Sequence, residues 1–242
     1  MTAKNNEQHN NKDLPEKREN IWVNLIFNIF APALILSKLS SDAYLGTTWA
    51  LIVALAFPFS YGLMDFVKRK SINIFSVLGL ISTLLTGTIS LLKLPPEYIA
   101  IKEAAIPGMI CMIVLISTWT PYPLVEKLIF NEAIFKLDYL KSIIAQQQLQ
   151  DQLDKVMKNC SLLVAASFAL SSLLNYILAI MVVVSDPGTV AYNEELGKMT
   201  ALSYPVIALP SMIVMGSALF YFMRKIQALT GHQLEDFLAI QP

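Results

Sequence analysis

The stretch SLLVAASFALSSLLNYILAIMVVVS, residues 161–185, decides the fold class of this chain. It contains 25 residues and no charged side chain. A helix of about 20 mostly apolar residues crosses the ~30 Å hydrocarbon core of a bilayer. The stretch is therefore long and apolar enough to form a transmembrane helix.

Five further apolar blocks lie around this one, and the whole chain is too apolar for an ordinary soluble domain. Its 242 residues are 55% hydrophobic and 15% charged, whereas soluble domains carry about 25% charged residues. We predict an all-α polytopic membrane protein, a bundle of about six transmembrane helices. The six expected spans are Ile21–Ser37, Tyr44–Met64, Ile72–Leu92, Tyr98–Thr118, Ser161–Ser185 and Met199–Met223.

The distribution of basic residues predicts the orientation. Lysine and arginine are enriched in cytoplasmic loops, and the expected external segments hold only Lys38, Lys93 and Lys198. Both ends are therefore expected inside. In chain order we expect a disordered cytoplasmic tail (1–20), helices 1–4 (21–118), a cytoplasmic amphipathic connection (119–160), helices 5–6 (161–223) and a cytoplasmic tail (224–242), with external loops at Lys38–Ala43, Lys93–Glu97 and Asp186–Lys198.

The connection at 119–160 is the one long loop. Its TPYP sequence, residues 120–123, blocks continuation of the preceding helix. An amphipathic stretch at 134–158 follows, and three interpretations fit it: a helix on the inner membrane surface, a helix packed on the protein itself, or a docking helix for a partner. Its apolar side comprises Leu137, Leu140, Ile143, Ile144, Leu149, Leu153, Val156 and Met157.

No recognisable catalytic or cofactor motif is present. The sequence lacks the zinc-protease, nucleophile-elbow, phosphate-loop, paired-cysteine and dinucleotide-turn motifs. Cys111 and Cys160 are expected to be packing residues, and His9 and His232 lie in the tails. We therefore expect no catalytic, cofactor-binding or metal-binding residue, no cofactor and no enzyme activity. The zero net charge suggests no nucleic-acid partner.

Lys102 and Glu103 are the first candidates for an intramembrane polar site, because ionisable groups inside a span are costly and usually functional. Adjacent residues on a helix point about 100° apart. We therefore expect the two side chains to pair with other helices rather than with each other. In the alternative interpretation, Lys102 extends to the nearby membrane surface.

Prolines inside the spans are candidate helix kinks, since each frees the carbonyl four residues earlier. Two of the freed carbonyls belong to Asn28 and Glu103, which carry polar side chains. Such groups either line a solvated cavity or cation site, or simply accompany a kink. The candidate kinks are Pro32, Pro58, Pro107, Pro205 and Pro210.

Small side chains form stripes at helical spacing on the third and fifth spans. Such stripes let membrane helices approach closely, although a substrate path is a second interpretation. Asn175 is the exception within its stripe, because an amide at mid-membrane needs a partner. The stripes comprise Ser76, Gly79, Thr83, Thr86, Gly87 and Ser90, and Ala165, Ala169, Ser172, Asn175 and Ala179.

Several segments carry a family resemblance. They are Asn73–Ser76 with Thr86–Gly87, Leu94–Glu97, Ile101–Pro107, Tyr122–Val125, Asn193–Gly197 and Met199–Pro205. Between Ile21 and Gly231 the chain resembles a family of uncharacterised bacterial inner-membrane proteins, which is distantly similar to the intracellular septation protein A group. The resemblance implies a multi-pass protein of the bacterial inner membrane, linked to envelope synthesis or division. It implies no catalytic or ligand residues.

Two functions of different classes follow as hypotheses. The favoured one is a non-enzymatic membrane protein that acts through partners in cell-envelope biogenesis or septation. The alternative is a small-solute secondary transporter with its site near Lys102 and Glu103. The expected partners are the lipid bilayer, envelope or division proteins and a second copy of the chain.

Overall fold

A computed structural model describes residues 26–69, 74–120, 123–129 and 136–237, and every regular element in these ranges is a helix. The expected tail at 1–20 lies outside them. The elements are the π-helix η1 (Ile26–Phe30), α2 (Ala31–Lys38), α3 (Gly46–Arg69), α4 (Ile74–Leu91), α5 (Glu97–Thr118), α6 (Leu124–Ile129), α7 (Leu137–Gln146), α8 (Gln150–Val182), α9 (Val190–Ser203), the π-helix η2 (Tyr204–Ala208), α10 (Leu209–Thr230) and α11 (Leu234–Phe237).

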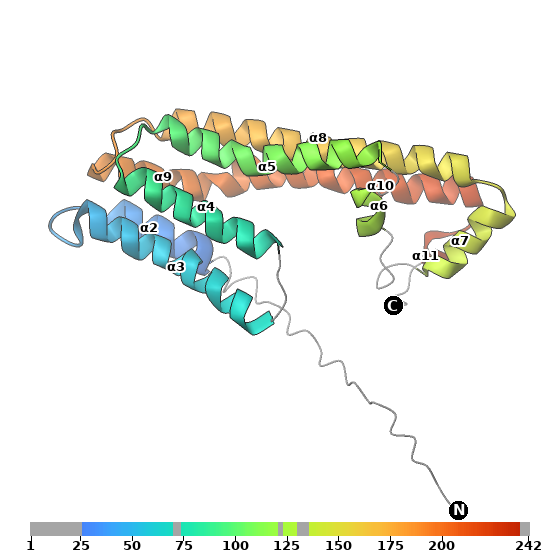
Figure 1. The fold of residues 1–242 in the computed structure, drawn as a ribbon, viewed down its shortest axis with the longest axis horizontal. Helices are drawn as coiled ribbons and strands as arrows, with labels where there is room; N and C mark the ends of the chain where they lie inside the picture. Colours follow the sequence, from blue (N-terminus) through green and yellow to red (C-terminus); the bar gives the residue numbers. More distant parts are fainter. Residues whose placement is uncertain (1–25, 70–73, 121–122, 130–135, 238–242) are drawn as a thin grey trace, which may run out of the picture.

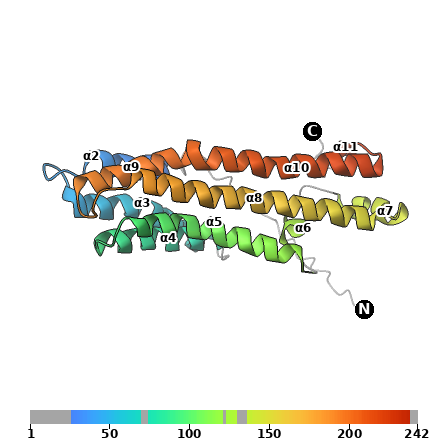
Figure 2. The ribbon, with the colours of Figure 1, turned by 90° about the horizontal axis from the view of Figure 1, so that it is seen from above.

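The helices form a long bundle built around α8 (Figures 1 and 2). α8 lies between α5 and α10, and the three run side by side along the long axis. α2, α3 and α4 pack at the end of the bundle where α9 begins. α6, α7 and α11 lie at the opposite end. Each end of the bundle has its own cluster of buried apolar side chains.

The described chain is all-α as predicted, and four of its helical segments are long and apolar enough to cross a membrane. They are Gly46–Met64, Glu97–Thr118, Gln150–Val182 and Val190–Thr230. α4 contributes a shorter apolar segment, Val77–Leu91, and the first expected span is described only from Ile26 onward. The number of six spans and their orientation remain predictions.

Two exposed aromatic side chains mark the ends of α5. Tyr98 is 50% exposed and Trp119 is 65% exposed. They lie 21 positions apart, which is about 31 Å along a helix at 1.5 Å per residue. Tryptophan and tyrosine favour the two interfaces of a bilayer, and the hydrocarbon core is ~30 Å thick. α5 therefore has the length and the end groups of a single membrane crossing.

The amphipathic stretch at 134–158 packs on the protein itself. A break at Gln147–Leu149, with Gln148 at φ 56°, divides it into α7 and the first turns of α8. Its described apolar side chains are buried, or for Leu149 partly buried, in one cluster with Phe222 and Ile226 of α10 and Phe237 of α11. Of the three interpretations of this stretch, packing on the protein is the one confirmed, and the apolar side is not a free docking surface.

The helix boundaries near this stretch also differ from those expected. α8 begins at Gln150 rather than at Ser161, and α10 continues to Thr230, into the expected tail. The backbone N–H of Lys136 donates to the carbonyl of Phe237 over 2.8 Å, so α7 and α11 are joined directly. α8 and α10 are longer than expected because each contributes apolar side chains to the same buried cluster. The helix stop at TPYP is confirmed, since α5 ends at Thr118 and α6 begins at Leu124.

The expected external loop Asp186–Lys198 is helical from Val190 onward, where α9 begins. Thr189 caps this helix by accepting a hydrogen bond from the Tyr192 N–H over 3.1 Å. Tyr192 and Asn193 are fully buried. The Asn193 amide donates to Ser40 Oγ over 3.1 Å and to the Thr47 carbonyl over 2.7 Å. A polar segment thus becomes a packed helix because its partners come from the α2–α3 region.

We predict the topology from the basic residues and test it with reporter fusions. Fusions at three positions should report the cytoplasm: Lys70, Ala145 and Gln241. Fusions at three others should report the outside: Asp42, Leu94 and Gly188. An external report at Ala145 would contradict the six-span arrangement, because the basic residues of the connection would then lie on the wrong side.

Candidate functional site

Lys102 lies on α5 and is 7% exposed. Its Nζ donates to three oxygen atoms, which is the full capacity of an ammonium group. These are Glu103 Oε1 at 2.6 Å, Thr86 Oγ1 at 2.7 Å and Ser82 Oγ at 3.2 Å. Two of the three acceptors belong to α4, so Lys102 ties α4 to α5.

The expectation that this pair contacts other helices is right for Lys102, which donates to two hydroxyls of α4. It is wrong in one respect, because Lys102 and Glu103 also form an ion pair with each other, although they are adjacent on one helix. The flexible four-carbon stem of lysine spans the 100° between them, which the backbone geometry alone did not predict. The Lys102 Nζ does not extend away from the bundle, because it is held by the partly buried hydroxyls of Ser82 and Thr86 on α4.

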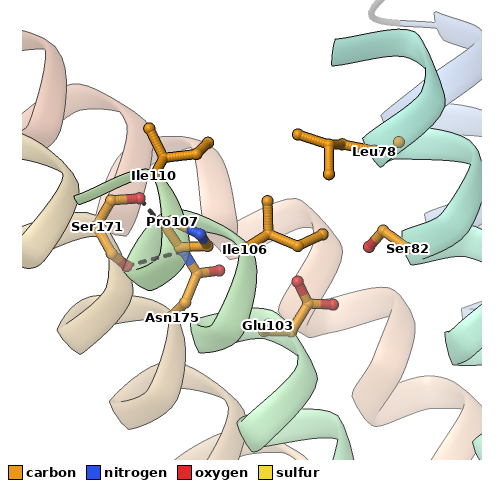
Figure 3. Close-up of a pocket in the computed structure, with 9 residues that line it drawn as sticks. Leu78, Ser82, Glu103, Ile106, Pro107, Ile110, Ser171 and Asn175 are labelled. Carbon is orange, nitrogen blue, oxygen red and sulfur yellow. Dashed lines mark hydrogen bonds between the residues drawn. The ribbon is translucent and has the colours of Figure 1, made fainter. Parts of the chain in front are cut away.

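A pocket of about 310 Å³ lies beside the ion pair, between α4, α5 and α8 (Figure 3). In the figure, Leu78 and Ser82 of α4 face Glu103, Ile106 and Ile110 of α5. α8 closes the other side with Ser171 and Asn175. The lining residues are Leu78, Gly79, Ser82, Glu103, Ile106, Pro107, Ile110, Ser171 and Asn175.

Asn175 finds its hydrogen-bond partner on its own helix. Its Nδ2 donates to the Ser171 carbonyl over 2.8 Å. The neighbouring Ser172 instead reaches across to α5, where it donates to the Ala104 carbonyl over 2.8 Å. Asn175 therefore belongs to the pocket wall, whereas Ser172 belongs to the α5–α8 contact.

The small-residue stripes form helix contacts at some of their positions. Ala165 and Ala179 of α8 are buried. A Cβ added at Gly87 would lie 3.2 Å from Leu55 Cδ1, so α4 approaches α3 closely there. Ser90 shares a 2.8 Å hydrogen bond with the Tyr192 hydroxyl. Gly79 differs from these, since it lines the pocket.

The candidate kinks fall into two structural types. Pro58 and Pro107 lie inside α3 and α5. The two π-helical segments lie at or beside the other three prolines, Pro32, Pro205 and Pro210. The wider turn of a π-helix accommodates the backbone hydrogen bond that proline cannot donate. Of the five prolines, Pro107 lines the pocket.

The structure brings Lys102, Glu103, Asn175 and Pro107 together at one site. The Asn28 backbone lies in η1, and its side chain is outside the described part of the chain. Sequence reasoning missed Ser82. One signal could have found it, because Ser82 precedes Thr86 by four residues and so shares its helix face.

The electrostatic character of the pocket comes from Glu103, which is the one ionisable residue in its lining. The other polar groups are the hydroxyls of Ser82 and Ser171 and the amide of Asn175. Within the described residues, no three histidine, cysteine, aspartate or glutamate side chains lie close enough together to hold a metal ion. The arrangement is suited to binding a small solute through hydrogen bonds and one negative charge.

The described chain is all-helical, has four segments able to cross a membrane by length and composition, and carries a pocket beside one of them that is lined by apolar side chains and a few polar groups. Comparisons of the chain with protein-family models, with curated proteins and with solved structures find no match.

Proposed function

We propose that the protein is a small-solute secondary transporter and that the pocket at Glu103 is its binding site. The observation that carries the proposal is a carboxylate in a pocket within a candidate span. An ionisable group at such a position is costly, so it marks a substrate or ion pathway by default. Counted from Tyr98 at 1.5 Å per residue, Glu103 lies about 8 Å inside the span.

The surroundings of the pocket agree with a transport role. Pro107 removes a backbone hydrogen bond beside the pocket, where interrupted helices commonly form transporter sites. Lys102 of α5 is hydrogen-bonded to Ser82 and Thr86 of α4, which links the two helices beside the pocket. A ligand that competes for these groups would loosen α4 from α5, which supplies a means of opening and closing the site.

The partner-dependent function in envelope biogenesis or septation is the second proposal, and the sequence resemblance favours it. Its expected docking surface was the apolar side of 134–158, which is packed inside the protein. A partner would therefore have to bind elsewhere. The bacterial inner membrane is the proposed location under both functions.

We predict that filling the pocket abolishes transport but not folding. A Cβ at Gly79 would meet nothing within 4 Å, so the position has room for a side chain, and Gly79→Leu adds a large one at the pocket wall. Gly216→Leu is the matched control, because a Cβ at Gly216 also meets nothing within 4 Å and Gly216 does not line the pocket.

The measurement is complementation of a deletion strain, scored by tolerance to a panel of small solutes and by cell shape. Under the transport proposal, Gly216→Leu restores tolerance and Gly79→Leu, expressed at equal level, does not. If both variants restore the phenotype, the pocket has no role in transport. A deletion phenotype confined to cell shape and rescued by both variants would favour the partner-dependent function.

A further inference from the structure

We infer that the ligand of the pocket is a small organic cation that joins an ammonium group to a short apolar part. This inference rests on the proposed function and names its substrate class. It is carried by the chemistry of the pocket lining and by the way in which the same groups already bind the side chain of Lys102.

The lining selects for positive charge. Glu103 is its one ionisable residue, and Lys102 lies behind the lining rather than in it. An anion placed in the pocket would therefore meet the carboxylate first. Glu103 already has Lys102 as one charge partner, so a neutral solute would gain only hydrogen bonds from the carboxylate. A cation would gain charge attraction as well.

Lys102 shows that these residues recognise an ammonium group. Its Nζ lies 2.6 Å from Glu103 Oε1 and 3.2 Å from Ser82 Oγ, and both residues also line the pocket. A carboxylate accepts about four hydrogen bonds through its two oxygens. Glu103 can therefore accept a second ammonium group from the pocket side, in competition with Lys102.

The remaining lining gives the size and character of the ligand. Leu78, Ile106, Pro107 and Ile110 form the apolar wall of the lining, on the same two helices as Ser82 and Glu103. Ligand pockets in proteins span about 300–1,000 Å³, so a pocket of about 310 Å³ belongs to the small end of that range. A bare metal ion would leave the apolar wall unused, whereas an alkylammonium ion covers it.

The test compares three probes that share one alkyl chain: butylammonium, butanol and butyrate. Each is titrated into the purified full-length protein in lipid nanodiscs at constant ionic strength, and the dissociation constant is measured by calorimetry. We expect butylammonium to bind at least tenfold more tightly than butanol or butyrate. Tighter or equal binding of either other probe, or no binding of butylammonium, would overturn the inference.

Variants locate the binding. Glu103→Gln should weaken butylammonium binding at least tenfold, whereas Glu97→Gln, an exposed acid on the same helix, should leave it unchanged. Lys102→Met should tighten it, because the internal competitor is gone. Should Glu103→Gln fail to fold, Gly79→Leu provides the same test by blocking the pocket. Unchanged binding in the folded pocket variants would place the probe elsewhere and refute the assignment.

Failure of the proposed ligand class can be distinguished from failure of the proposed transport function. If butyrate or butanol binds in the pocket and Gly79→Leu still abolishes complementation, the ligand class is wrong and the transport function stands. If Gly79→Leu complements fully, the transport function itself fails, whichever probe binds.

Discussion

Replacing Lys102 with methionine is expected to lower the free energy of unfolding by roughly 3 kcal/mol, the size of effect seen when one partner of a buried ion pair is removed. The variant loses three hydrogen bonds, two of which hold α4 against α5. It also leaves Glu103 without its cation. Glu103→Gln should cost less, because the ammonium keeps Ser82 and Thr86 and the glutamine oxygen still accepts.

The double variant Lys102→Met/Glu103→Gln should recover part of the loss, since an unpaired charge is the least stable state. Equilibrium unfolding of the purified protein in detergent measures all three variants. Lys155→Met is the control, because Lys155 is exposed and a surface substitution changes stability by less than about 0.5 kcal/mol. Equal stability of Lys102→Met and Lys155→Met would show that Lys102 and its hydrogen bonds do not hold α4 against α5.

Gly197→Ala is expected to destabilise the protein by about 2–3 kcal/mol through overpacking. A Cβ at this position would lie 2.8 Å from the Ala33 carbonyl oxygen and 2.7 Å from Ser37 Oγ. The carbonyl is part of the α2 backbone and cannot rotate away, so α9 must move off α2. A thermal melt should fall by roughly 2–4 °C per kcal/mol for a chain of this size.

Two variants make this test specific. Gly216→Ala is the control, because a Cβ there meets nothing within 4 Å and alanine is a better helix former than glycine by about 1 kcal/mol. Adding Ser37→Ala to Gly197→Ala should restore only part of the stability, since the carbonyl contact remains. A Gly197→Ala protein as stable as the wild type would mean that α2 and α9 are not packed together at this point.

The same region explains how α8 is joined to α9. The Glu195 carboxylate accepts hydrogen bonds from the backbone N–H groups of Val184 and Ser185 over 2.9 and 2.8 Å, and from Ser185 Oγ over 2.7 Å. A carboxylate satisfies these N–H groups better than a neutral acceptor does. Glu195 lies within the expected external loop Asp186–Lys198. Its carboxylate thus fixes the turn that directs α9 back onto the bundle.

The sequence by itself determined the helical membrane class. Helix positions follow from long apolar blocks, and hydropathy is a property of neighbouring residues along one chain. Lys102, Glu103, Asn175 and Pro107, which the structure places at one site, were also singled out from the sequence, because a polar or proline residue in an apolar block is conspicuous without any structure.

Only the tertiary structure decided which groups meet. The Lys102 ammonium group contacts Glu103 on its own helix and two hydroxyls of α4. The local sequence around Lys102 does not identify these α4 hydroxyls as its partners. The polar segment after Val190 folds as a helix because the partners of Asn193 lie about 150 residues earlier in the chain. The apolar side of 134–158 is covered by α10 and α11. Hydrogen bonds and packing between distant segments depend on how the chain folds back on itself, and that information is not contained in any local stretch of sequence.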